Sequence, residues 1–308
     1  MAIDVGLHTG PQEISMDDLR RVWTRADDAG FRWISVWDHF YANPLRDRTE
    51  PCFEGVAAMA ALAALTKRVE VGCLMFCALY RSPALLAKAA VTIDHISGGR
   101  ANLGVGAGWL QEEFEDFGYR FPPIGERFEH MEEALKIIRA LFEEDSVTFE
   151  GRHYRVTNAV CSPRPVQKRL PLWVGGRGPK RTPQMAARYA DGFNVPYVSP
   201  EDFKARQEVV DRTCEEIGRD PASVKRTVNL GFYMGADAKA AERNREGTKR
   251  MDPTMLGGMI VGTADEAIER MEKFVAAGAQ GINIATRPPI DWDAFEAFIE
   301  NVLPHFHG

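Results

Sequence analysis

The feature of this chain that most restricts its fold is a regular alternation of short, strand-forming apolar runs with longer amphipathic stretches that favour helices. The strand-forming runs cover residues 3–7, 33–37, 69–79, 101–105, 172–174, 192–195, 228–233 and 281–284. Apolar strands joined by crossover helices belong to parallel sheets. Eight such units without a proline- or serine-rich linker favour a closed (β/α)8 barrel over an open, doubly wound sheet. We therefore expect residues 1–308 to form a single α/β barrel domain with insertions at its mouth.

Two segments interrupt this alternation. Residues 146–165 are expected to contain a hairpin, because Glu150 and Gly151 form a turn signal between two short polar–apolar runs. Residues 236–262 are rich in charge and glycine and show no clear periodicity. We interpret this second segment as an insertion or a mobile loop at the barrel mouth.

Composition narrows the class of partner and the compartment. The 38 Lys and Arg residues against 44 Asp and Glu residues give a net charge of −6, without a long basic run, which argues against nucleic-acid and membrane-surface partners. The first ten residues lack the features of a secretory signal, and the longest apolar run, residues 55–66, is shorter than the roughly 20 residues of a membrane helix. Five cysteines without a CxxC pair favour reduced thiols. We expect a cytoplasmic protein that acts on a small molecule.

In a barrel, the catalytic groups come from the C-terminal ends of the strands and the loops after them. Asp38 and His39 follow the second expected strand and form an adjacent acid–imidazole pair. An imidazole titrates near neutral pH, so His39 can move a proton or hydrogen-bond to a reacting group, and Asp38 can orient a ligand or raise the pKa of His39. The alternative is a strand-end histidine that bonds to a neighbouring loop.

A glycine cluster follows the fifth expected strand. Residues Gly175, Gly176, Arg177 and Gly178 come directly before a helix that is expected to begin near Pro179. Bare backbone N–H groups at a helix N-terminus, with an arginine beside them, favour a phosphate site over the alternative of a plain tight turn. The glycines at 104, 106 and 108 do not form a dinucleotide-binding fingerprint, because the third glycine has the wrong spacing and the run follows the fourth strand.

The sequence offers little support for metal or thiol chemistry. It contains no HxH or HExxH motif and no carboxylate cluster at the expected strand ends, so we expect no metal. Cys73 and Cys77 lie in an apolar strand, where a small buried thiol is the ordinary outcome.

An ordered set of motifs carries a resemblance to a known family. The set consists of residues 81–88, 94–100, 104–109, 122–128, 148–151, 175–176 and 189–194. In this order the segments resemble the bacterial luciferase-like superfamily of flavin- and deazaflavin-dependent barrels, and more narrowly its LLM-class coenzyme F420-dependent oxidoreductases. The similarity covers essentially the whole chain.

The resemblance implies a set of cofactor-binding residues. It assigns the cofactor phosphate to Gly175–Gly178, including Gly176 and Arg177, and the ring or side chain to Ala107 and Gly108. A non-proline cis peptide behind the ring is expected at the Cys73–Leu74 bond. The resemblance further implies that Asp38 contacts the cofactor, and that His39 protonates or orients the substrate.

One departure from the family pattern bears on the substrate. The sugar-phosphate dehydrogenases of this group carry an acid/base glutamate directly after the glycine run, where this chain has Trp109. An aromatic wall at this position favours a less polar substrate, and Glu113 is the candidate to replace the missing acid.

The leading hypothesis is an F420-dependent oxidoreductase that moves a hydride between C5 of the deazaflavin and a small organic substrate. The alternatives are an FMN-dependent monooxygenase, a non-catalytic flavin- or deazaflavin-binding protein and, with least support, a metal-dependent sugar isomerase. A homodimer is a further expectation from the resemblance.

Overall fold

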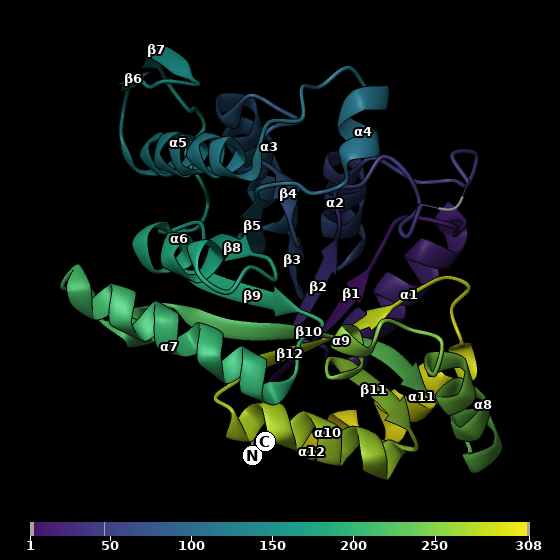
Figure 1. The fold of residues 1–308 in the computed structure, drawn as a ribbon. Coiled ribbons are helices and arrows are strands. Elements are labelled where there is room, and N and C mark those ends of the chain that lie inside the picture. Colours follow the sequence, from purple (N-terminus) through teal and green to yellow (C-terminus); the bar gives the residue numbers. More distant parts are fainter. Residues whose placement is uncertain (1–2, 46, 307–308) are drawn as a thin grey trace.

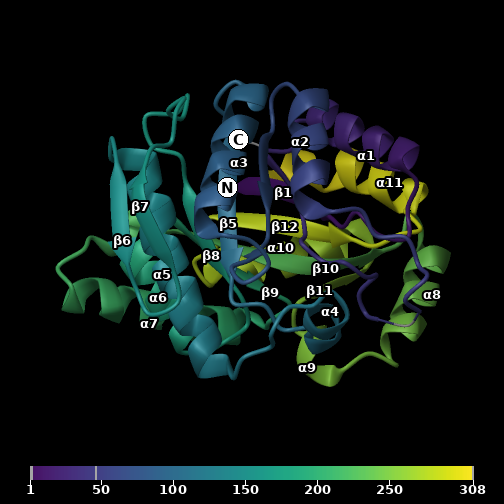
Figure 2. The same cartoon turned by 90° about the horizontal axis from the view of Figure 1, so that it is seen from above.

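A computed structural model describes residues 3–45 and 47–306 and confirms the expected barrel (Figures 1 and 2). Within these residues, eight parallel strands follow one another around the ring, and the pairing of the first with the last closes it. They are β1 (Asp4–Thr9), β2 (Trp33–Val36), β3 (Glu70–Cys73), β5 (Ala101–Gly106), β8 (Leu172–Gly175), β9 (Gly192–Pro196), β10 (Lys225–Met234) and β12 (Gly281–Thr286). Most of the strand positions are buried, as parallel strands covered by helices require.

Helices surround the barrel in the positions that the periodicity predicts (Figure 2). They are α1 (Met16–Ala29), α2 (Gly55–Leu65), α3 (Pro83–Ser97), α5 (Ile124–Glu143), α6 (Arg181–Tyr189), α7 (Pro200–Glu216), α10 (Ala264–Ala276), α11 (Trp292–Asn301) and α12 (Leu303–Phe306). The Ser15 hydroxyl accepts a hydrogen bond from Asp18 N at the start of α1, and Gly30 ends that helix at φ 90°. Thr263 and Glu266 form a capping box on α10. Among the described helices, none combines the length and apolar character needed to cross a membrane.

The run expected as one strand over residues 69–79 is divided. β3 ends at Cys73, and a separate short strand, β4 (Phe76–Cys77), pairs with the end of β5. A non-proline cis peptide lies between the two strands, at Leu74–Met75. The expected position, Cys73–Leu74, is therefore wrong by one residue, and Met75 rather than Leu74 takes the half-buried place at the strand end.

Residues 236–262, interpreted as an insertion or a mobile loop, are an insertion built of regular elements rather than a loop. They form α8 (Ala238–Thr248), α9 (Pro253–Leu256) and β11 (Met259–Gly262). β11 pairs with Gly231–Met234 at the C-terminal end of β10. The glycines reflect close packing, since a Cβ atom on Gly258 would lie 2.4 Å from the backbone of Tyr197. The charged residues lie largely on the exposed face of α8.

The remaining elements lie outside the ring. The expected hairpin is present as β6 (Val147–Glu150) and β7 (Arg155–Ala159), and it projects beside α5 in Figure 1. A short helix, α4 (Gln111–Asp116), follows β5, and a 3₁₀ turn (Pro221–Ser223) precedes β10.

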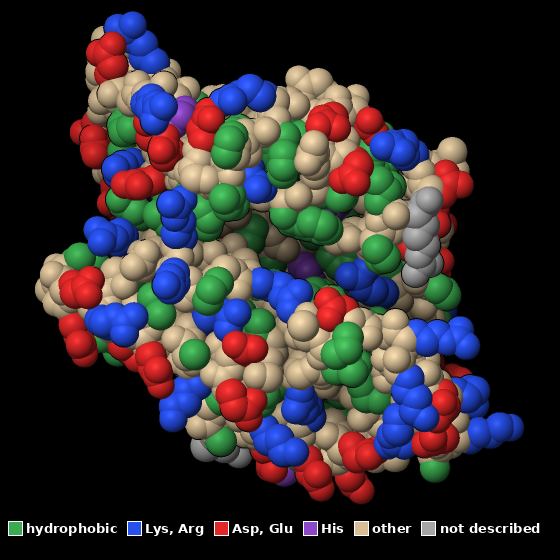
Figure 3. All heavy atoms as spheres, in the orientation of Figure 1, with side chains coloured by type: hydrophobic (Ala, Val, Ile, Leu, Met, Phe, Trp, Pro, Cys, Tyr) green, Lys and Arg blue, Asp and Glu red, His purple; other side chains and the backbone are tan. Residues whose placement is uncertain are grey.

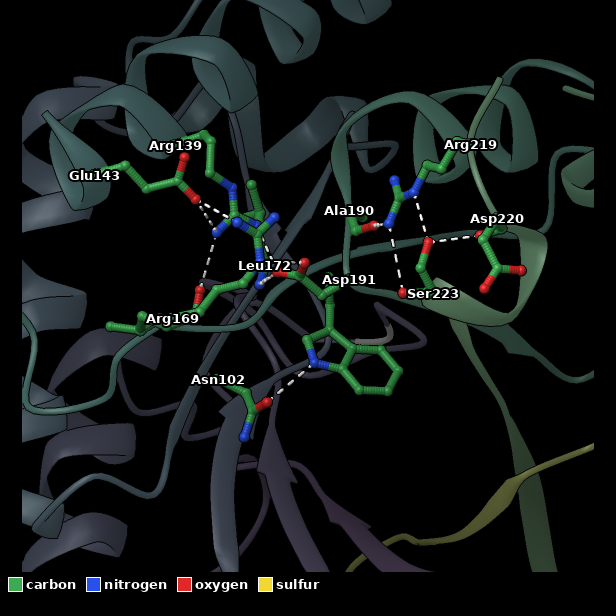
Figure 4. A network of polar contacts seen from close by, with 12 residues as sticks. Asn102, Arg139, Glu143, Arg169, Leu172, Ala190, Asp191, Arg219, Asp220 and Ser223 are labelled. Carbon is green, nitrogen blue, oxygen red and sulfur yellow. Dashed lines mark hydrogen bonds and ion pairs between the residues drawn. The ribbon is translucent and has the colours of Figure 1, made fainter. Parts of the chain in front are cut away.

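A polar network ties the elements together at the N-terminal end of the strands (Figure 4). The Asp191 carboxylate, just before β9, accepts hydrogen bonds from Leu172 N at 2.9 Å, from Arg139 at 2.5 Å and from Arg169 Nε at 2.8 Å. On the other side, Arg219 donates to Ala187 O at 2.9 Å and Ala190 O at 2.7 Å and thereby caps the C-terminus of α6. These contacts join α5, α6 and the starts of β8 and β9.

Candidate active site

The sequence-derived candidates gather at the C-terminal end of the barrel. β2, β5 and β8 run into the Asp38–His39, Ala107–Gly108 and Gly175–Gly178 segments, respectively. In parallel strands these ends meet at one face of the barrel. In Figure 3 this face is hollowed at its centre, and a histidine side chain is visible in the hollow.

His39 contacts Glu113 rather than its neighbour Asp38. Its Nδ1 lies 3.0 and 3.1 Å from the two Glu113 carboxylate oxygens. The same carboxylate accepts hydrogen bonds from Phe40 N at 2.7 Å, Tyr41 N at 3.1 Å and the Tyr80 hydroxyl at 2.9 Å. Glu113 is 0 % exposed, whereas the side chain of His39 keeps 14 % of its surface open. Glu113 is therefore placed behind His39 and holds it.

The hydrogen bonds determine the protonation of this pair. Burial alone raises the pKa of Glu113, but the bonds from His39 and from the amides of Tyr41 and Phe40 outweigh it and hold the pKa below its usual value. An ionised carboxylate can only accept hydrogen bonds, so His39 Nδ1 must carry the proton that points to Glu113. His39 Nε2 is thereby left for chemistry at the mouth, with the amide nitrogen of Asn43 at 3.5 Å.

The Asp38 carboxylate is hydrogen-bonded to other groups of the protein. Its two carboxylate oxygens accept hydrogen bonds from the Arg81 guanidinium at 2.7 and 2.8 Å, and one of them also accepts from Cys77 N at 2.9 Å. Arg81 in turn contacts Glu54 at the start of α2. The side chain of Asp38 has no exposed surface, so the structure gives it contacts that fix the ends of β2 and β4. Sequence spacing gave no sign of Arg81 as its partner.

Leu74 and Met75 form a bulge between β3 and β4, and glycines at the ends of β5 and β8 leave room for it. Cβ atoms built on Gly104, Gly106 and Gly175 would lie 2.5, 3.1 and 2.2 Å from the side chain of Met75. These glycines therefore let Met75 lie across the strand ends. Leu74 is buried below it in a cluster with two tryptophans inside the barrel.

The neighbouring candidates Ala107 and Gly108 are half-buried at the end of β5. Gly108 needs its left-handed φ of 71°, and a Cβ atom there would lie 2.7 Å from Cys77 Sγ. Burial raises the pKa of the Cys77 thiol to about 12, and Cys73 is fully buried, so both are packing residues as expected.

The glycine loop after β8 fits an anionic phosphate group. Gly176 has a φ of 145°, which favours glycine. A Cβ atom on Gly178 would lie 2.8 Å from Thr182 Oγ1, so a larger residue there would fill the space beside the loop. α6 begins at Arg181, slightly later than the expected Pro179, and within the described residues no side chain caps its N-terminus. Arg177 is exposed beside the loop. Uncapped N–H groups, bare backbone and a cation together suit a phosphate.

Aromatic side chains line the other side of the mouth. Trp109 is 59 % exposed, and its ring meets that of His39 edge-on at a centroid distance of 5.5 Å. Behind it Phe40 stacks on Tyr80 at 4.5 Å, next to Phe117, which is 51 % exposed. The free face of His39 therefore lies beside an apolar surface rather than beside a second carboxylate.

Residues at the ends of β1 and β12 complete the site. His8, after the first expected strand, is a sequence-based candidate to line the mouth, whereas sequence reasoning missed Arg287. Arg287, just after β12, donates a hydrogen bond to Asn43 O and lies 5.7 Å from the ring of Trp37. His8 is buried and bonded to Ser35 Oγ at 2.8 Å, and burial together with Arg287 lowers its pKa to about 3. His8 is therefore neutral and belongs to the floor of the site.

Comparison with known proteins identifies the family. The model of the luciferase-like monooxygenase family matches residues 1–259 of the chain. The chain belongs to this family. Among its relatives, the F420-dependent glucose-6-phosphate dehydrogenase of Amycolatopsis mediterranei is 29 % identical over 98 % of both chains. The 5,10-methylenetetrahydromethanopterin reductase of Archaeoglobus fulgidus is 33 % identical over 84 % of this chain and 72 % of its own length.

Solved structures agree on the fold. An F420-dependent secondary alcohol dehydrogenase, solved with an F420–acetone adduct, superposes with a TM-score of 0.86 over the full length of both chains at 22 % identity. These relatives act on a sugar phosphate, a pterin and an alcohol according to their names, so the family fold is shared while the substrate differs.

Proposed function

We propose that the protein is a coenzyme F420-dependent oxidoreductase that acts on a small organic substrate. One observation carries this proposal: the same end of the barrel holds a glycine loop that fits a phosphate and a histidine, His39, that is hydrogen-bonded to the buried Glu113 carboxylate. Membership of the luciferase-like family, with F420-dependent dehydrogenase and reductase relatives, supports F420 as the cofactor. When bound, F420 supplies or accepts a hydride at C5 of its deazaflavin ring.

The chain's own residues then bind, orient and exchange protons. Gly175–Gly178 and the N-terminus of α6 would hold the phosphate, and Met75, Ala107 and Gly108 would border the ring. His39 exchanges a proton with the substrate oxygen or nitrogen through Nε2, while Glu113 keeps Nδ1–H in place and so fixes the orientation of the imidazole. Glu113 is a positioning residue in this proposal, because its buried carboxylate reaches the substrate only through His39.

The surroundings of His39 favour a substrate with an apolar body. By the resemblance, Trp109 stands where the sugar-phosphate dehydrogenases of this group have a glutamate. Its exposed ring offers mostly apolar surface and a single N–H donor instead of a carboxylate. We therefore place small ketones, secondary alcohols, enones and imines ahead of sugar phosphates. Asp38 supports this mouth from behind through Arg81 rather than by contact with the cofactor.

FMN remains the competing cofactor, because the family also contains monooxygenases and the phosphate loop fits either group. A titration of the apoprotein with F420 and with FMN, followed by tryptophan fluorescence, separates them. Selective binding of F420 supports the proposal, and selective binding of FMN replaces it with oxygen chemistry. If neither cofactor binds, the proposed function is wrong.

A pair of variants connects this titration to the loop. In Gly178→Ala the new Cβ atom would meet Thr182 Oγ1 at 2.8 Å, so cofactor affinity should fall by about tenfold or more. Gly247→Ala, on α8, adds a Cβ atom with nothing within 4 Å and should bind the cofactor as the wild type does. Equal losses in both variants would contradict the assignment of the loop.

We also propose a single-domain, cytoplasmic homodimer. The pairing of β1 with β12 joins the two ends of the chain in one barrel, and all five cysteines are free thiols. Leu85 (60 % exposed) and Ile96 (45 % exposed) are exposed apolar side chains on α3, and this helix is our candidate for the interface. Light scattering after size-exclusion chromatography tests this part, and a monomer at micromolar concentration would contradict it.

A further inference from the structure

A second cluster of titratable side chains lies away from the mouth, where the hairpin meets α5. Glu126 and His130 lie one turn apart on α5, and His153 comes from the turn between β6 and β7. One ligand atom of each side chain falls within 4.8 Å of the other two. Figure 3 shows histidine among acidic and basic groups at this projecting corner. None of these residues belongs to the site described above.

The histidines are held in place but are incompletely bonded. Glu133 accepts hydrogen bonds from the backbone amides of Arg152, His153 and Tyr154 at 2.8, 3.0 and 2.9 Å, so the hairpin turn is fixed against α5. The His130 and His153 rings stack at a centroid distance of 3.9 Å. His130 Nδ1 is buried and has no hydrogen-bond partner among the residues that the structure describes.

The spacing of the polar atoms suits a shared cation better than it suits hydrogen bonds. His130 Nε2 lies 3.9 Å from Glu126 Oε1, which is too long for a hydrogen bond. In a tetrahedral site with ligand bonds of about 2.0–2.1 Å, the ligand atoms lie about 3.3 Å apart. The three ligand atoms here are within 4.8 Å of one another, so side-chain rotations that move them by about 1–1.5 Å would bring them into range.

We propose that Glu126, His130 and His153 bind a divalent transition-metal ion such as Zn²⁺. Two imidazoles and one carboxylate form a donor set that Zn²⁺ accepts. Glu129, whose carboxylate lies 3.0 Å from His153 Nε2, is available as a fourth ligand or as the partner of a bound water. Glu126 must exchange its contact with Arg120 for the metal, which an exposed arginine permits. The ion fastens the hairpin to α5.

The test uses full-length protein without a histidine tag, stripped with a chelator and titrated with Co²⁺ and then with Zn²⁺. Visible absorption reports the coordination of Co²⁺, and calorimetry gives the stoichiometry and affinity for Zn²⁺. We expect one ion per chain, a cobalt spectrum of four- or five-coordinate type and a rise in melting temperature with Zn²⁺.

Variants decide whether these residues are the ligands. His130→Ala and His153→Ala should each weaken Zn²⁺ binding by at least about 10–100-fold, the loss that even outer-shell partners cause. Glu126→Gln keeps the volume of the side chain and should weaken binding without disturbing the hairpin. His305→Ala is the matched control, because it removes an exposed histidine paired with Glu272 at 3.0 Å and should change nothing. Absence of saturable binding, or equal binding in wild type and His153→Ala, would overturn the proposal.

Discussion

A carboxylate that accepts backbone hydrogen bonds is present at each end of the barrel, and the two carboxylates have different roles. Glu113 at the mouth is buried and Asp191 at the opposite end is half-buried, and both carboxylates accept backbone hydrogen bonds. The partners of Asp191 include Arg139 and Arg169, whose guanidinium groups bind neighbouring protein groups. The partner of Glu113 is His39, which keeps Nε2 for the mouth. The difference teaches that a carboxylate serves stability when its partners bind only groups of the protein, and function when one partner directs an atom to the mouth.

The strongest test of this comparison removes Nε2 of His39. His39→Gln should lower kcat by about 10²–10⁴-fold, the usual range for loss of a positioned acid or base, while cofactor affinity and melting temperature stay nearly unchanged. Steady-state kinetics with the substrate found in screening, together with an F420 titration, provide the measurement. His95→Gln, a change on the exposed side of α3, is the control. A fully active His39→Gln enzyme would remove His39 from the mechanism.

A smaller loss is expected from Glu113→Gln. The amide keeps the shape but brings N–H donors toward the Nδ1–H of His39 and the Tyr80 hydroxyl, so the imidazole loses its fixed orientation. We expect kcat to fall by about 10–100-fold with little change in cofactor affinity, and the pH profile of kcat to shift. Glu112→Gln, on the exposed neighbour in α4, should behave as wild type. An unchanged pH profile with lower stability alone would mean that Glu113 is purely structural.

Asp191→Asn probes the other end of the comparison. Loss of the charge leaves Arg139 and Arg169 without their shared carboxylate, and the free energy of unfolding should fall by about 2–4 kcal/mol. Urea unfolding measures this loss, and kcat of the folded variant should stay at the wild-type value. Asp145→Asn removes the fully exposed partner of Arg164 and should cost less than about 1 kcal/mol. A large activity loss in folded Asp191→Asn would break the division of roles.

The same residue predicts a pH dependence. Burial raises the pKa of Asp191, but Leu172 N and the two arginines outweigh it and hold the pKa below its usual 3.8. A carboxylate with a depressed folded-state pKa contributes stability above its unfolded-state pKa and loses that contribution as the pH falls through the folded-state value. The free energy of unfolding of the wild type should therefore decrease as the pH is lowered below about 4. In urea titrations at several pH values, Asp191→Asn should show a smaller decrease over the same range.

The smallest expected effect concerns the aromatic wall. Trp109→Ala should raise KM for an apolar substrate by about tenfold, because it removes exposed aromatic surface, while the free energy of unfolding changes little. Trp109→Phe should recover most of the affinity. If the KM values of polar and apolar substrates rise equally, Trp109 does not select the substrate.

The barrel was predictable because its signals are local. Strand-forming runs, helical periodicity and caps such as Ser15 with Gly30 depend on neighbours within a few residues, and most elements follow them to within one or two residues. The rule that barrel sites lie at the C-terminal ends of strands likewise placed the glycine loop and His39 at the mouth, where the structure has them. Contacts across the mouth were harder to predict, because His39 and Glu113 are 74 residues apart and Asp38 and Arg81 are 43 apart.

The errors have the same physical origin. The cis bond at Leu74–Met75 depends on how the bulge fits against Gly104 and Gly175, which spacing along the chain does not reveal. The glycines near residue 258 resemble a mobile loop in the sequence, yet they allow close contact with Tyr197 from another part of the chain.

Strand β10 pairs with three other strands, and this pairing leaves part of the barrel mouth free to vary. Residues Lys225–Asn229 pair with β9 and residues Thr227–Gly231 pair with β12, so the ring is already closed before β11 joins at Gly231–Met234. α8, α9 and β11 therefore form an accessory unit attached beyond the point of closure. Arg177 of the glycine loop touches this unit at Thr254 O. A lineage can exchange or lengthen the unit and so reshape one wall of the mouth, while the hydrogen bonds that close the barrel stay intact.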